Sequence, residues 1–132
     1  MKNDIKKVQN KDQGKKIKEY NFSKKLTPLI RLTLKRNEKF YGPGIVELLK
    51  LIEKNGSIQK AAKEMEMSYS KAWNIIKRVE RELEEKVVET RSGGSGGGET
   101  NLTQFGKDFM EKYSNCLEEI MQFTKKSFEK YF

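Results

Sequence analysis

Residues 56–83 read GSIQKAAKEMEMSYSKAWNIIKRVEREL and contain the most informative pattern in the sequence. It contains two apolar series at helical spacing, which predict two consecutive helices. The first series is Ile58, Ala61, Ala62 and Met65, and the second is Ala72, Ile75, Ile76, Val79 and Leu83. Ser57 and Ser68 directly precede the two helices, where a serine side chain caps a helix N-terminus. Because the turn between the helices is short and small alanines allow a close crossing, the stretch predicts a helix-turn-helix.

The segments before this motif predict a strand and a further helix. Residues 29–34 are rich in β-forming residues and predict a short strand, and residues 37–44 predict a turn region. Residues 45–52 carry apolar side chains at helical spacing, so they predict an amphipathic helix that ends at Gly56.

A β-hairpin is predicted directly after the helix-turn-helix. Residues 86–91 and 99–102 are its strands, and the Gly- and Ser-rich residues 92–98 are its loop. A hairpin in this position is the wing of a winged helix. The loop lacks the Gly-Lys-Ser/Thr sequence of a P-loop, which excludes that phosphate-binding motif. By composition alone it is also compatible with an engineered Gly/Ser linker.

A long final helix is predicted from Thr103, its N-cap, to about residue 130. Its five lysines are balanced by five acidic residues, which is more typical of a packing or dimer interface than of a nucleic-acid surface. Cys116 is expected to be a small packing residue on this helix. The predicted dimer-interface residues are Phe105, Phe109, Tyr113, Leu117, Ile120, Met121 and Phe128. The fold class is therefore mainly α with a small β-hairpin: a winged helix-turn-helix with a long C-terminal dimerisation helix.

Composition and charge narrow the possible functions. The 132 residues include 28 Lys and Arg against 19 Asp and Glu, a net charge of +9 that favours an anionic partner. There is no His and only one Cys, which excludes a His-based active site, a zinc finger and a disulfide framework. We expect no catalytic residues, no metal site and no cofactor. Without a signal peptide or a long apolar run, the protein is expected to be cytoplasmic and to have no membrane partner.

The charge is concentrated at the N-terminus. Residues 1–25 contain nine lysines and three acidic residues, so they predict a Lys-rich flexible tail. Residues 26–132 are predicted to form the winged helix-turn-helix DNA-binding domain, which includes the long C-terminal helix. The tail is either a solvated arm or an arm that follows a phosphate backbone.

The second helix of the motif has a polar face that could read DNA. Residues in the first turns of such a helix lie nearest the base edges, so base readout is assigned to Tyr69, Ser70, Lys71 and Asn74. The cations further along suit phosphate contacts, and they are Lys77, Arg78 and Arg81. Further contacts are assigned to the helix N-termini at Ser57 and Ser68 and to the wing residues Arg91, Ser92, Gly93 and Gly94. Trp73 is expected to lie in the core. The alternative is an ordinary solvated helix face.

Several short motifs occur here in the order of a known family. Gly56-Ser57-Ile58, Ala61-Ala62, Met67-Ser68-Tyr69, Ala72-Trp73 and Leu102-Thr103-Gln104-Phe105-Gly106 resemble the DNA-binding domain of ModE-type molybdate-responsive regulators and, more distantly, the LysR-type winged helix. The similarity covers roughly residues 29–125. It implies operator binding as a dimer that is paired through the first and last helices. ModE-type regulators append molybdate-binding domains after the last helix, and no residue up to Phe132 is assigned to oxyanion sensing.

These observations lead to one function hypothesis and two alternatives. The protein is expected to be a transcriptional regulator that binds double-stranded DNA sequence-specifically as a homodimer on a near-palindromic operator. The first alternative is a winged-helix protein-interaction or dimerisation scaffold with unspecific anion binding. The second is an oxyanion sensor that binds molybdate. A separate signal-sensing partner protein is one source of the regulatory signal.

Overall fold

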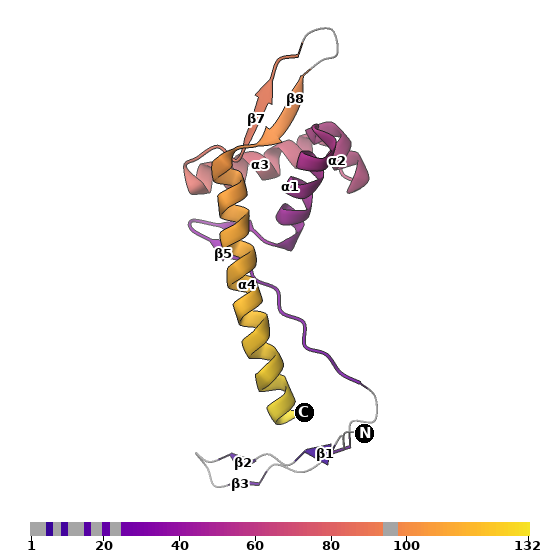
Figure 1. The fold of residues 1–132 in the computed structure, drawn as a ribbon, viewed down its shortest axis with the longest axis vertical. Helices are drawn as coiled ribbons and strands as arrows, with labels where there is room; N and C mark the ends of the chain where they lie inside the picture. The colour runs from indigo at the N-terminus through magenta and orange to yellow at the C-terminus, as the bar shows by residue number, and fades with distance from the viewer. Residues whose placement is uncertain (1–4, 7–8, 11–14, 17–19, 22–24, 94–97) are drawn as a thin grey trace. The chain divides into compact units, whose positions relative to one another are not determined.

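The computed structural model describes residues 5–6, 9–10, 15–16, 20–21, 25–93 and 98–132. The chain divides into two compact units. Arg31–Ser114 form the winged-helix unit, and Met1–Ile30 together with Asn115–Phe132 form the terminal unit. Figure 1 shows the order of the elements along the chain. The predicted winged helix-turn-helix with a long C-terminal helix is confirmed, because the described residues form four helices and a small antiparallel hairpin in the expected order.

Three helices build the predicted helix-turn-helix and the helix before it. They are α1 (Pro43–Asn55), α2 (Ile58–Glu64) and α3 (Tyr69–Leu83). Both predicted serine caps are confirmed, since Ser57 Oγ accepts the Lys60 N–H at 3.1 Å and Ser68 Oγ accepts the Lys71 N–H at 3.1 Å. Gly56 ends α1 in the left-handed conformation at φ 69°, which favours a residue without a Cβ.

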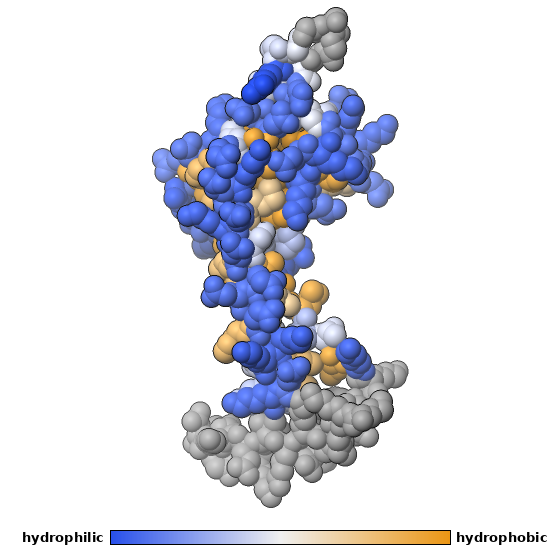
Figure 2. Space-filling view, viewed as in Figure 1, coloured by the Kyte–Doolittle hydropathy of each residue, from blue (hydrophilic) through white to orange (hydrophobic). Residues whose placement is uncertain are grey.

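The core of the winged-helix unit lies where these three helices cross. Each helix contributes buried apolar side chains, and those of the crossing are Leu48, Leu49, Ile52, Ala61, Ala62, Ala72, Ile76 and Val79. The two alanines of α2 and Ala72 of α3 are no more than 1% exposed, so their small size allows the close crossing that the sequence predicted. Figure 2 shows hydrophilic residues over most of the visible face of this unit.

The wing is formed by β7 (Val88–Arg91) and β8 (Glu99–Leu102), which pair antiparallel from Val88↔Leu102 to Arg91↔Glu99. Its base is fixed to the helices by backbone contacts. The Thr100 N–H donates to the carbonyl of Gly56 at 2.8 Å, and the Thr103 N–H donates to the carbonyl of Val87 at 3.0 Å. These bonds tie the wing to the α1–α2 turn and to the start of the last helix.

The predicted strand at residues 29–34 is wrong over most of its length. Within the described residues, regular structure here is limited to β5 (Leu34–Lys35), which pairs with β6 (Lys39–Tyr41), a strand inside the predicted turn region. The difference has a physical cause, because β-forming side chains make a strand only where a partner strand satisfies their backbone groups.

The last helix, α4 (Gln104–Tyr131), has nearly the predicted length. Its predicted cap is confirmed, since Thr103 Oγ1 accepts the Gly106 N–H at 2.9 Å. Cys116, which was expected to be a small packing residue, is exposed instead. The charge-balanced helix presents more of its surface to solvent than its apolar series suggested, with Phe123 73% exposed in the terminal unit.

The predicted tail at residues 1–25 is described only in part. Its described strands are β1 (Ile5–Lys6) paired with β4 (Tyr20–Asn21), and β2 (Gln9–Asn10) paired with β3 (Lys15–Lys16). Most of the remaining predicted tail lies outside the described residues. None of the helices in the described part of the chain has the length and hydropathy that a bilayer span requires.

Candidate nucleic-acid interface

The first turns of α3 are open to solvent. Four residues here are all exposed: Tyr69, Ser70, Lys71 and Asn74. Tyr69 is 50% exposed. The opposite face of α3 is buried through Ala72, Ile76 and Val79. The structure therefore brings together the four residues to which base readout was assigned, on a helix held rigidly by its core-facing side.

Trp73 is the clearest departure from the sequence prediction at this site. It was expected in the core, but it is 42% exposed. The Lys77 ammonium lies 5.2 Å from the centroid of its ring, one helical turn further along α3. Trp73 follows the buried Ala72, so it lies at the edge of the core-facing stripe rather than inside it. Its exposure adds an apolar surface to the open face of α3.

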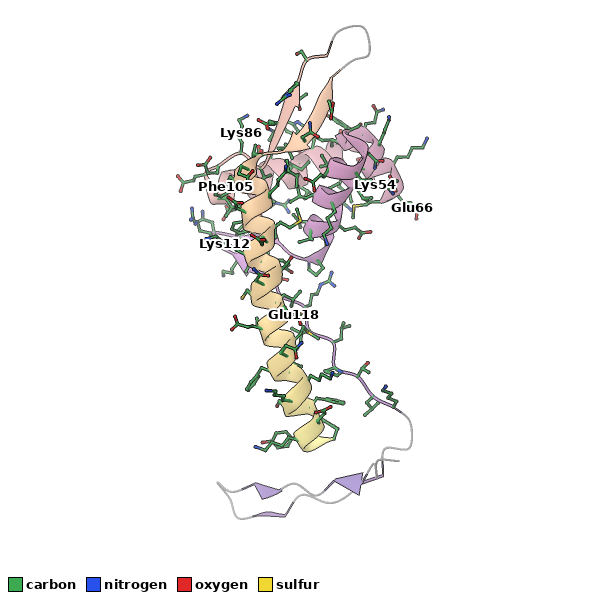
Figure 3. The ribbon with its side chains drawn as sticks, viewed as in Figure 1. Lys54, Glu66, Lys86, Phe105, Lys112 and Glu118 are labelled. Atoms are coloured by element: carbon green, nitrogen blue, oxygen red, sulfur yellow. The ribbon has the colours of Figure 1, made fainter. Side chains whose placement is uncertain are left out.

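A groove with a volume of about 540 Å³ lies between α3, the start of α2 and the wing. Aromatic and cationic side chains of α3 line one wall, and wing residues line the other. The lining includes Ser57, Gln59, Tyr69, Trp73, Lys77, Lys86, Glu89 and Thr90. Lys86 is labelled in Figure 3 and lies just before β7. Gln59, Lys86 and Glu89 were not among the predicted site residues, because the packing of α2 and of the wing against α3 brings them to the groove.

The cations assigned to phosphate contacts are engaged in ion pairs. Arg78 Nε lies 3.5 Å and Arg81 NH2 3.3 Å from the carboxylate of Glu38. Lys77 Nζ lies 3.1 Å from Glu80 Oε1, which is an i, i+3 pair on α3. By contrast, Lys71 makes no ion pair within the part of the chain that the structure describes. Carboxylates therefore partly neutralise the cations in the last turns of α3, and less positive charge is available there for an anionic ligand.

Two acidic residues of α3 anchor the elements on either side of it. Glu80 Oε2 accepts the Val87 and Val88 N–H groups at 2.9 and 3.3 Å, which attaches the base of the wing. On the other side, Glu82 Oε1 accepts the Asn37 N–H at 2.7 Å, although Glu82 is only 3% exposed. This backbone hydrogen bond lowers the pKa of Glu82 below its ordinary value. No local pattern in the sequence indicates these anchors, since their hydrogen-bond partners lie in other elements.

The wing presents both charge signs. Arg91, Ser92 and Gly93 are exposed at the end of β7, whereas Gly94 lies outside the described residues. Glu99 is the register partner of Arg91, and Glu89 is exposed on the same strand as Arg91. The predicted cation of the wing is therefore accompanied by carboxylates.

The predicted dimer residues fall into two groups. Tyr113 is 4% exposed, and its hydroxyl donates to the carbonyl of Leu32 at 2.7 Å. The Tyr41 ring contacts those of Phe109 and Tyr113 at centroid distances of 4.8 and 5.0 Å, and Phe105 stacks on Phe109 at 6.1 Å. These residues pack inside the winged-helix unit. The others lie in the terminal unit with partly exposed side chains, and they are Leu117, Ile120, Met121 and Phe128.

Among the described residues, no group of three or more His, Cys, Asp or Glu side chains is arranged to hold a metal ion. The geometry is instead that of a winged helix-turn-helix domain. An exposed helix, a second helix that packs across it and a hairpin alongside are the elements with which domains of this class contact a DNA duplex.

The comparisons with known proteins agree with this class. Residues 46–107 match the model of the bacterial regulatory helix-turn-helix protein, lysR family. The chain is 38% identical over 94 residues to the DNA-binding transcriptional dual regulator ModE of Escherichia coli, covering 70% of this chain and 36% of that protein. It is 35% identical over 85 residues to the transcriptional regulator ModE of Haemophilus influenzae, covering 64% of this chain and 33% of that protein.

A third relative, the molybdenum-pterin-binding protein MopB of Rhodobacter capsulatus, is 33% identical over 99 residues, covering 75% of this chain and 36% of MopB. The chain thus spans about a third of the length of the curated relatives it matches. Residues 46–107 thus match a LysR-type helix-turn-helix model, and the chain resembles the DNA-binding N-terminal domain of ModE-type regulators, as the sequence motifs predicted.

Proposed function

We propose that this protein is a transcriptional regulator that binds double-stranded DNA sequence-specifically, with residues 26–132 as its DNA-binding domain. The observation that carries the proposal is the open face of α3 beside the wing groove. Tyr69, Ser70, Lys71 and Asn74 are exposed there together. An α-helix fits the major groove, and Asn and Lys side chains can pair with adenine and guanine edges.

A second part of the proposal is that the protein acts as a homodimer. The terminal unit holds an apolar groove of about 300 Å³, lined by Pro28, Phe123, Phe128 and Tyr131 among others. Figure 2 shows apolar side chains on the visible surface of this unit, and Phe123 is 73% exposed. Apolar surface of this kind is stabilised when a second copy covers it. A homodimer places two recognition helices on a near-palindromic operator, with half-sites about one helical turn apart or a multiple of it.

The DNA-binding proposal is tested by selecting bound sequences from a random duplex pool at about 150 mM salt, where weak unspecific binding is largely lost. We expect a near-palindromic consensus with a fixed half-site spacing. A pool that shows no enrichment would instead favour a protein-interaction scaffold with unspecific anion binding.

The dimer proposal is tested by analytical ultracentrifugation of the whole chain. We expect Phe123→Ser to weaken association, because it removes an exposed apolar side chain, whereas the neighbouring exposed Gln122→Ser serves as the control. A wild-type protein that sediments as a monomer at concentrations where it binds DNA would contradict this part. We also propose that the protein is cytoplasmic and that a separate signal-sensing partner protein is one source of its regulatory signal.

A further inference from the structure

One carboxylate lies between the two arginines of the recognition helix. Glu38, in the turn between β5 and β6, has Oε1 3.5 Å from Arg78 Nε and Oε2 3.3 Å from Arg81 NH2. All three side chains are between 43% and 60% exposed. The pairs are thus at the surface, where each ion pair is weak and a competing anion can reach the guanidinium groups.

The turn that carries Glu38 is held against α3 by further contacts. The buried Glu82 accepts the Asn37 N–H at 2.7 Å and, more weakly, the Glu38 N–H at 3.5 Å. Arg36 NH1 lies 2.9 Å from Oε2 of Glu84, the residue that directly follows α3. Because these contacts hold the backbone of the turn next to α3, the Glu38 carboxylate is within reach of both arginines.

The two arginines share one side of α3 with residues to which base readout was assigned. Lys71, Asn74, Arg78 and Arg81 follow one another at helical spacing of three and four residues, so they lie along one stripe. A duplex that contacts Lys71 and Asn74 therefore brings its phosphates toward Arg78 and Arg81. At that point the Glu38 carboxylate competes with phosphate for the same guanidinium groups and repels it.

We propose that Glu38 limits the affinity of this protein for the DNA backbone by occupying Arg78 and Arg81. This inference rests on the proposed function. The consequence is weak attachment to arbitrary sequences, so that base contacts near the start of α3 contribute a larger share of the binding free energy.

The test compares Glu38→Gln with Glu84→Gln in the full-length chain. Both variants remove one negative charge near α3, but only Glu38 contacts Arg78 and Arg81, since Glu84 pairs with Arg36. Fluorescence anisotropy measures binding to a random-sequence duplex and to the selected operator. We expect Glu38→Gln to tighten binding to both duplexes by about three- to tenfold, and the salt dependence to steepen by about one phosphate contact. We expect Glu84→Gln to produce a much smaller gain.

A second measurement ties the gain to the two arginines. In an Arg78→Gln/Arg81→Gln background, the further change Glu38→Gln should give no gain, because the groups that Glu38 occupies are absent. Equal gains for Glu38→Gln and Glu84→Gln, or weaker binding by Glu38→Gln, would overturn the inference. If the wild-type chain shows no sequence preference, the proposed function fails. If the preference is present but the two variants behave alike, only the role of Glu38 fails.

Discussion

The two ends of α3 both carry polar residues to which DNA contacts were assigned, but their surroundings differ. At the start, Tyr69, Ser70, Lys71 and Asn74 are exposed, and Lys71 makes no ion pair within the described residues. At the end, Arg78 and Arg81 pair with Glu38. The number of cations on a recognition helix therefore does not by itself predict how strongly the helix attracts phosphate. Carboxylates on neighbouring elements can pair with some of these cations, as Glu38 does here.

The largest expected effect comes from displacing the wing, which borders the start of α3. A Cβ added at Gly106 would overlap the carbonyl oxygen of Val87 at the wing base. We therefore expect Gly106→Ala to lower the free energy of unfolding by about 2–3 kcal/mol, since backbone cannot yield as a flexible side chain does. Urea unfolding measures this change. Gly44→Ala is the control, because nothing lies within 4 Å of a Cβ there, and it should be neutral or stabilising. Similar losses in both variants would contradict the close-approach explanation.

The second effect separates the two ends of α3 directly. We expect Asn74→Ala to cost roughly 1–3 kcal/mol on the selected operator and to relax preference at one base pair. Arg78→Ala should weaken operator and random duplex alike, by less than about 1 kcal/mol, because Glu38 already occupies the guanidinium. Anisotropy titrations with both duplexes check this. Equal losses of Asn74→Ala on the operator and on random DNA would remove its readout role.

The third effect concerns the turn that presents Glu38 at the end of α3. Hydrogen bonding from the Asn37 N–H lowers the pKa of Glu82 below its ordinary value of 4.5. A lowered folded-state pKa contributes stability that is present above the unfolded value and is lost as the pH falls through the folded one. We expect acidification from neutral pH to well below 4.5 to destabilise the wild type more than Glu82→Gln, which cannot titrate at this site. Urea unfolding across this pH range measures both. Parallel pH profiles would show that Glu82 does not contribute.

The smallest effects test the aromatic core beneath β6. The Tyr113 hydroxyl donates to the carbonyl of Leu32, so Tyr113→Phe should cost about 1 kcal/mol of unfolding free energy. The buried Tyr41 hydroxyl has no hydrogen-bond partner within the described part of the chain. Tyr41→Phe should therefore leave stability unchanged or raise it slightly, because an unsatisfied polar group is removed. Thermal unfolding measures the stability of both variants. A larger loss of stability for Tyr41→Phe than for Tyr113→Phe would contradict these assignments of the two hydroxyl groups.

Local signals in the sequence were sufficient for the helices and their ends. Ser57, Ser68 and Thr103 cap the helices that they were predicted to cap, and Gly56 ends α1. Capping depends on side chains within three residues of the backbone group they satisfy, so it can be read from a short window. The strand at residues 29–34 failed because a strand needs a partner, and no short window contains that partner.

The sequence predicted the exposed residues of α3 in the candidate site, but not which residues of other elements lie beside them. Tyr69, Ser70, Lys71 and Asn74 were chosen from helical periodicity and are exposed as expected. Trp73 was assigned to the core, since periodicity does not resolve the edge of an apolar stripe. Of the residues that line the groove, Lys86 and Glu89 were missed because the wing brings them to α3.

The order of the helices, their caps, the close alanine crossing and the wing were all predictable from the amino-acid sequence, because each depends on neighbours along the chain. Which cations of α3 are free depends instead on contacts between distant segments. Glu38 and Arg81 are separated by 43 residues, and their ion pair exists because Glu82 holds the β5–β6 turn against the helix. Such a contact leaves no periodicity in the sequence, since it depends on where two distant segments are packed.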